Sequence, residues 1–267
     1  MTAPRRPVHP PVQRQVWRAP QRRRKRRLLP RLFRLTVLTL TLLLFLALGR
    51  LFSLVLPGLA QAVVSPFTGS KTLLSVEYLG QSDYPTGCES VTAVMALRQA
   101  GVEISVDEFI DFCLPKGEVW EEGGRLVGDD PYLCFIGDPR SSSGFGCFAP
   151  ALARGLAAAA GEDRVQDLTG RSLARLCRDY IDQGTPVILW ATIDMKEPRQ
   201  GRSWTLNATG ETFTWTAGEH CLLLVGYDRD CYYFNDPYQD KGLTAYEKDL
   251  AESRYQALGC QALALTG

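Results

Sequence analysis

The sequence predicts an α+β fold for residues 73–267, with helices first and a mostly antiparallel sheet after them. Three observations support this prediction. A helical spacing of apolar residues begins at Cys88, a continuous apolar run covers residues 186–193, and pairs of short strand-like segments follow that run. No long linker or internal repeat interrupts this region, so we expect one domain.

The helices of the first half are predicted from apolar spacing and end signals. The first begins near Gly87-Cys88 and ends before Gly101, with an apolar stripe of Val91, Val94 and Met95. A capping-box pattern at residues 105–108 predicts a short second helix. Two more helices are expected at residues 148–160 and 172–183, the latter ended by Gly184. Residues 115–147 are rich in Gly and Asp and are expected to form a long ordered loop.

The strands are predicted for the second half of the domain. The apolar run at 186–193 is typical of a buried central strand. Two antiparallel pairs are expected next, followed by a late helix at residues 245–258 and a last strand at 260–265. The paired segments are residues 203–207 with 211–216, and 221–227 with 231–235.

The first 50 residues differ in charge from the rest of the chain. They hold 13 of the 30 Lys and Arg residues, and the first acidic residue is Glu77. The remainder therefore carries 17 basic against 29 acidic side chains, a net charge of −12. A basic segment can bind nucleic acid. This one leads directly into the apolar residues 35–56, so we expect a membrane as its partner and no nucleic acid.

We interpret residues 35–56 as a single transmembrane helix that precedes the domain. About 20 apolar residues span a bilayer, and this segment reaches that length if Arg50 extends toward the outer headgroups. The positive charge on its N-terminal side predicts that residues 1–34 are a cytoplasmic tail, with a stalk at 57–72 and the domain outside the cytoplasm. In the alternative, a secretory signal is cleaved near Ala62 and the domain is secreted.

The eight cysteines suit an oxidising compartment. They contain no C-x-x-C pair, and residues 73–267 hold a single histidine, so neither a zinc site nor another metal site is expected. If one cysteine stays free as a nucleophile, the seven others cannot all pair with one another. Disulfides and buried free thiols therefore both remain open.

Three residues suggest nucleophilic catalysis. Cys88 begins an amphipathic helix, where unpaired N–H groups and the helix dipole favour a thiolate. His220, the single histidine of the domain, precedes an apolar strand and is the available general base. Asp236 follows the next strand, whose antiparallel return would bring its carboxylate to His220 and fix the tautomer of the ring. Asn235 is an alternative residue for that orienting role.

The residues around these positions resemble the C39-like peptidase family of bacterial surface proteins. The similarity covers roughly residues 76–265 and is strongest in three runs, QSDYPTGCESV at 81–91, GEHCLLLVGYD at 218–228 and FNDP at 234–237. It implies a papain-like fold and a Cys/His/Asp triad, with Gln81 at the oxyanion position. The separation of 132 positions between Cys88 and His220 agrees with the roughly 130–150 of papain-like enzymes.

The predicted function is that of a membrane-anchored, extracytoplasmic cysteine peptidase that acts on a peptide or protein and needs no cofactor. Bacteriocin-processing members carry Asp-Cys-Gly at the nucleophile, whereas this chain has Gly87-Cys88-Glu89, so leader removal at a double-glycine site is not expected. Two alternatives belong to other classes. One is amidase or transglutaminase-like acyl transfer on cell-wall peptide, and the other is a non-catalytic surface binding domain.

Overall fold

The structure is a computed structural model that describes residues 71–266. These residues belong to one compact unit, Phe67–Gly267. The predicted tail, transmembrane helix and nearly all of the stalk lie outside the described residues. Within residues 71–266, no helix combines the length and the apolar character that crossing a membrane requires.

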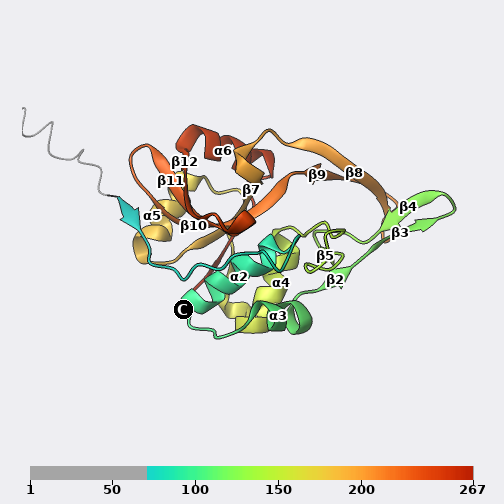
Figure 1. The fold of residues 1–267 in the computed structure, drawn as a ribbon, viewed down its shortest axis with the longest axis horizontal. Helices are drawn as coiled ribbons and strands as arrows, with labels where there is room; N and C mark the ends of the chain where they lie inside the picture. The colour runs from blue at the N-terminus through green and yellow to red at the C-terminus, as the bar shows by residue number, and fades with distance from the viewer. Residues whose placement is uncertain (1–70, 267) are drawn as a thin grey trace, which may run out of the picture. The chain divides into compact units, whose positions relative to one another are not determined.

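A seven-stranded sheet forms the centre of the domain (Figure 1). Its strands follow the order β12-β11-β10-β7-β13-β6, while β1 pairs with β10, and every pair is antiparallel. β7 is buried at all of its residues, as a central strand should be. The predicted antiparallel sheet is therefore confirmed. The strands are β1 Thr72–Leu73, β6 Val165–Asp167, β7 Val187–Thr192, β10 Glu219–Tyr227, β11 Cys231–Asp236, β12 Gly242–Glu247 and β13 Ala262–Leu265.

Helices cover both faces of this sheet and enclose two apolar clusters (Figure 1). On one face, α2 (Cys88–Gln99) and α4 (Ala149–Ala160) pack on Trp190 and Leu223. On the other face, α5 (Leu173–Asp179) and α6 (Lys248–Ala257) pack on Leu189 and Leu222. Neighbouring residues of one strand thus point to opposite clusters, which is the two-residue period of a strand.

The helices of the first half agree with the predictions. α2 begins at Cys88 and ends before Gly101, but its burial extends around the whole helix from Cys88 to Leu97 rather than along a stripe. The capping box of Ser105 and Glu108 is present, and it starts α3 (Val106–Glu108). The chain continues as a π-helical turn, Phe109–Cys113. α4 follows Phe148, as predicted.

The loop predicted at residues 115–147 is partly wrong, because the segment contains four short strands. β3 and β4 form a hairpin through Gly123-Gly124, whose positive φ angles of 57° and 78° favour glycine. The hairpin joins β8 and β9, the predicted pair, in a second sheet with order β3-β4-β8-β9 (Figure 1). The strands are β2 Lys116–Gly117, β3 Val119–Glu122, β4 Arg125–Gly128, β5 Phe135–Ile136, β8 Arg199–Leu206 and β9 Thr212–Ala217.

Several predicted boundaries near the C-terminus also need correction. The late helix begins at Lys248 instead of residue 245, because Gly242–Glu247 pairs with β11 as strand β12. The helix predicted at 172–183 ends at Asp179 and is followed by a 3-10 turn at Ile181–Gln183. All eight cysteines are free thiols in the structure.

Candidate active site

Cys88 is the first residue of α2, and a tight turn places it there. The backbone N–H of Gly87 donates to the carbonyl of Tyr84 at 2.9 Å, and the N–H of Val91 donates to the carbonyl of Gly87 at 3.0 Å. Gly87 caps the helix without a side chain. Cys88 is 7% exposed and belongs to the apolar cluster beneath α2. The predicted position of the thiol at a helix start is confirmed.

His220 and Asp236 form a buried pair, as the predicted return of the strand requires. The Nε2 of His220 lies 2.7 Å from the Oδ1 of Asp236, and these residues are 1% and 0% exposed. β10 and β11 pair with Leu223 opposite Asn235. Asp236 is one residue further along β11, so its side chain lies on the same face of the sheet as that of His220. Because a carboxylate can only accept, Nε2 carries a proton, and in the neutral ring Nδ1 then keeps its lone pair.

Asp236 is held as a carboxylate by its surroundings. Burial tends to raise its pKa, but the hydrogen bond and charge of His220, the backbone N–H of Tyr238 and the ammonium of Lys241 keep the pKa below its usual value. The alternative residue, Asn235, donates its amide to the carbonyl of Val76 at 3.5 Å and makes no hydrogen bond with His220. The structure therefore places Asp236, and not Asn235, at the imidazole ring.

Gln81 lies in the turn that leads to Cys88 and is 5% exposed. Its backbone N–H donates to the carbonyl of Pro237 at 3.1 Å, so the turn is fixed beside the end of β11. The side-chain Nε2 makes a long hydrogen bond of 3.4 Å with the carbonyl of Tyr84, and Oε1 is buried without a partner. The turn thus connects the start of α2 with the strand that carries Asp236.

Two buried glutamates lie beside Cys88, and the sequence analysis did not identify them. Oε2 of Glu89 accepts from Sγ of Cys88 at 3.2 Å, while its Oε1 accepts from the N–H of Cys147 at 2.6 Å. Glu219 precedes His220 on β10, and its Oε1 is buried without a partner. The clue in the sequence was available: one acid follows the candidate nucleophile and another precedes the candidate base, each beside apolar residues.

These surroundings oppose ionisation of the thiol. Burial raises the pKa of Cys88 well above its usual value, and the carboxyls of Glu89 and Glu219 raise it further. Burial also raises the pKa of Glu89 to about 7 and that of Glu219 well above its usual range. The helix dipole, which was expected to favour the thiolate, is therefore outweighed.

Cys88, Glu89 and Glu219 each place one ligand atom within 4.8 Å of the other two, which is close enough for a shared cation. The hydrogen bond from Cys88 to Glu89 accounts for the contact without a metal. A thiol proton shared between Cys88 and Glu89 is the arrangement that the structure shows at this cluster.

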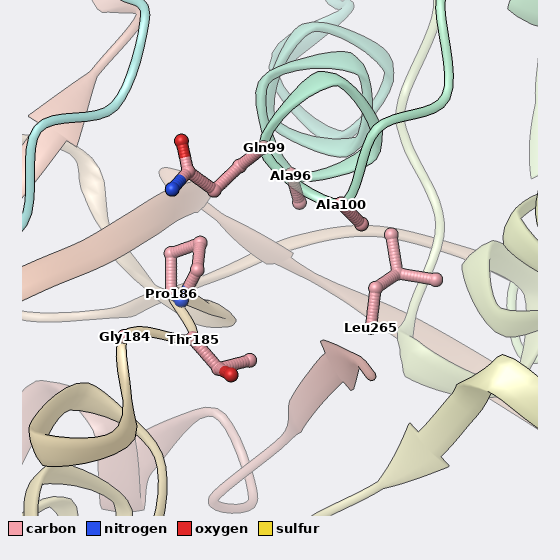
Figure 2. A pocket seen from close by; sticks show the side chains of 7 residues that line it. All are labelled: Ala96, Gln99, Ala100, Gly184, Thr185, Pro186 and Leu265. Carbon is pink, nitrogen blue, oxygen red and sulfur yellow. The ribbon is translucent and has the colours of Figure 1, made fainter. Parts of the chain in front are cut away.

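A separate small pocket lies at the far end of α2 (Figure 2). Its volume is about 170 Å³, and it is lined by the last turn of α2, the segment Gly184–Pro186 and Leu265. Since α2 has 12 residues and rises about 1.5 Å per residue, Ala100 is roughly 18 Å from Cys88 along the helix axis. The pocket is therefore not part of the site around the thiol.

Comparison with known proteins identifies a family. The model of the Peptidase_C39 like family matches residues 73–263. The crystal structure of a candidate C39-like peptidase from Bacillus anthracis is similar, with a TM-score of 0.66 and 23% identity over 74% of this chain and 98% of the other. At that identity the likeness concerns the fold. No curated protein sequence matches the chain.

The buried acid pair predicts an unusual dependence of stability on pH. Because its pKa is raised, Glu219 keeps its proton in the folded protein, whereas in the unfolded chain it releases the proton above about pH 4.3. The free energy of unfolding therefore falls as the pH rises from there to the raised pKa of folded Glu219. Glu219→Gln should therefore raise the melting temperature at pH 8 by a few degrees, since roughly 1 kcal/mol corresponds to about 2–4 °C. The gain should vanish near pH 4.

Thermal unfolding between pH 4 and 8 measures this effect. Glu211→Gln, which removes an exposed carboxyl between β8 and β9, is the matched control. A gain for Glu219→Gln that is the same at every pH would contradict the explanation by ionisation.

Proposed function

Because this chain belongs to the Peptidase_C39 like family, we propose that it is a cysteine peptidase in which Cys88 is the nucleophile and His220 the general base. The observation that carries the proposal is the contact between His220 and Asp236, 2.7 Å apart and almost fully buried. This contact leaves Nδ1 of the imidazole as the proton acceptor. Glu219 and Cys221, which flank His220 on β10, both act on the thiol of Cys88, so the start of α2 adjoins the stretch of β10 that carries the proposed base.

The proposed reaction is acyl transfer in two steps. The thiol proton moves to Nδ1 of His220, and Sγ of Cys88 forms a bond with the carbonyl carbon of the peptide. When the C–N bond breaks, His220 returns the proton to the leaving amine and a thioester remains. Water then attacks the thioester while His220 takes its proton. The C–S bond breaks, the acid is released, and the proton returns from His220 to Sγ of Cys88. Asp236 stabilises the imidazolium in both steps.

Gln81 is proposed as a donor to the oxyanion. Negative charge develops on the carbonyl oxygen during attack, and donors must already lie near that position. The backbone N–H of Cys88 at the helix start is one such donor. Two features support Gln81 as the other: its turn leads directly into α2, and the 3.4 Å bond of its Nε2 is long enough to be exchanged readily for a charged acceptor.

The triad is tested by substitution at its two partners. His220→Ala should leave the domain folded and remove most hydrolysis of a peptide library, a loss of at least a thousand-fold in kcat. Asp236→Asn should also impair turnover, because an amide can hold the wrong tautomer of His220. Asn235→Ala is the matched control, since Asn235 lies beside Asp236 but does not contact the ring, and its turnover should stay near that of the wild type. Normal turnover in His220→Ala would exclude the Cys/His mechanism.

Gln81→Ala separates stabilisation of the oxyanion from activation of the thiol. Loss of one oxyanion donor lowers turnover by about a hundred- to a thousand-fold, or ~3–4 kcal/mol. Alkylation of Cys88 by iodoacetamide develops no oxyanion, so its rate should remain close to that of the wild type. Steady-state kinetics and alkylation of one preparation give both values. If peptide hydrolysis is normal in Gln81→Ala, another group stabilises the oxyanion.

We also propose that residues 35–56 anchor the peptidase domain outside the cytoplasm. The proposal is supported by the sequence, in which 13 basic residues lie within the first 50 and no acid precedes Glu77. Protease treatment of spheroplasts should degrade the C-terminal domain and spare the N-terminal tail. A soluble product that begins near Val63 would instead indicate a cleaved signal peptide.

A further inference from the structure

The thiol of Cys88 is bound to a carboxylate and not to the imidazole. Its Sγ donates to Oε2 of Glu89 at 3.2 Å. His220 forms its side-chain hydrogen bond with Asp236. Within residues 71–266, no hydrogen bond joins the sulfur of Cys88 to the ring of His220. The peptidase that we propose above therefore needs a change at Cys88 before the base can take its proton.

The carboxylate of Glu89 is held in place by the backbone of Gly146 and Cys147. Its Oε1 accepts from the N–H of Cys147 at 2.6 Å, and the side chain is fully buried. Gly146, with φ of +145°, passes directly over it: a Cβ at Gly146 would collide with Oε1 of Glu89 and lie 3.3 Å from Oε2 of Glu219. The backbone thus leaves room for both carboxyls at one place.

No basic side chain compensates this pair. Among the described residues, neither Glu89 nor Glu219 takes part in an ion pair. Two buried carboxyls within 4.8 Å of one another cannot both ionise readily, so one of them retains a proton. Glu89 accepts two hydrogen bonds and Glu219 has an oxygen without a partner, so the charge belongs on Glu89 and the proton on Glu219.

We propose that Glu89 is a further catalytic residue: it binds the Cys88 thiol in the resting protein, and the nucleophile forms only after the thiol turns from Glu89 to His220. Glu219 is a positioning residue that keeps its own proton and leaves the charge on Glu89. This inference rests on the proposed function, because it concerns the same thiol and base. Its consequence is a latent thiol, protected from electrophiles and oxidants until a substrate carbonyl occupies the site.

The titratable groups that face the sulfur agree with a resting thiol that is held by Glu89. Glu89 comes from α2, and Glu219 and Cys221 come from β10. Cys147, in the segment before α4, lies beside Glu89. The two other thiols are buried and carry raised pKa values, so they stay neutral near pH 7. Lys241 lies beyond His220 on Asp236. After burial, the carboxylate of Glu89 is therefore the strongest influence on the ionisation of the resting thiol.

The experiment measures how fast iodoacetamide alkylates Cys88 as a function of pH. The thiolate displaces iodide, a C–S bond replaces the C–I bond, and the thiol proton passes to solvent. Full-length protein is used, and mass spectrometry of the peptide that contains Cys88 separates this thiol from the other seven. No peptide hydrolysis is needed, so the result does not depend on whether the chain is a peptidase.

Glu89→Gln is the decisive variant because it keeps an oxygen for the N–H of Cys147 while it removes the charge beside the sulfur. The midpoint of the alkylation profile should move down by at least one pH unit, which makes alkylation about ten-fold faster on the acid side of the midpoint. Glu219→Gln should change the midpoint much less, because the charge stays on Glu89. The double variant should have the lowest midpoint, and the exposed Glu211→Gln should match the wild type.

Two results for Glu89→Gln would contradict the proposal. An unchanged midpoint in Glu89→Gln would show that Glu89 only accepts from Cys147, and a higher midpoint would show that it takes the thiol proton as a base. Either result overturns the proposal. If Glu89→Gln does not fold, Glu89→Asp replaces it, because the shorter side chain withdraws the carboxylate from Sγ and should also lower the midpoint. Faster alkylation without any peptide turnover would refute the proposed function and leave the role of Glu89 in place.

Discussion

The burial of α2 against the central strands is the constraint on which the rest of the domain depends. All ten residues from Cys88 to Leu97 are buried, and the hydroxyl of Thr92 donates to the carbonyl of Cys221 at 3.2 Å. This bond ties the helix to β10 next to His220. Since β10 also pairs with β7 and β11, one packed helix fixes the relation between the thiol and the strand that leads to Asp236.

Because α2 is buried on all sides from Cys88 to Leu97, its polar residues also lie in the interior. A helix with only an apolar stripe inside would leave Glu89 in solvent, whereas α2 carries it into the interior. A buried carboxyl costs free energy unless it is hydrogen-bonded or protonated, and two of them within 4.8 Å of one another cost more. Such clusters of perturbed carboxyls are more common at functional sites than in structural cores. The fold places this pair beside the thiol of Cys88.

The sequence was most informative where a local pattern determines the structure. The return of β11 beside β10 depends on a short turn and a two-residue period, so the contact of Asp236 with His220 could be predicted. β12 could not be separated from the helix that follows it, because residues 242–247 become a strand through pairing with β11. The pairing of Glu89 with Glu219 depends on how deeply α2 packs on β10, and a helical stripe of Val91, Val94 and Met95 does not contain that information.

The balance of effects at the sulfur means that the helix start alone does not activate the thiol of Cys88. A helix start contributes about 0.3–1 kcal/mol in favour of a negative charge. Burial and an adjacent carboxylate oppose that charge more strongly, since a single unit of pKa already corresponds to about 1.4 kcal/mol. A thiol at this helix start therefore cannot ionise through its position alone. In the proposed mechanism the proton passes to His220, and the buried carboxylate that holds the far nitrogen of this ring would stabilise the resulting positive charge.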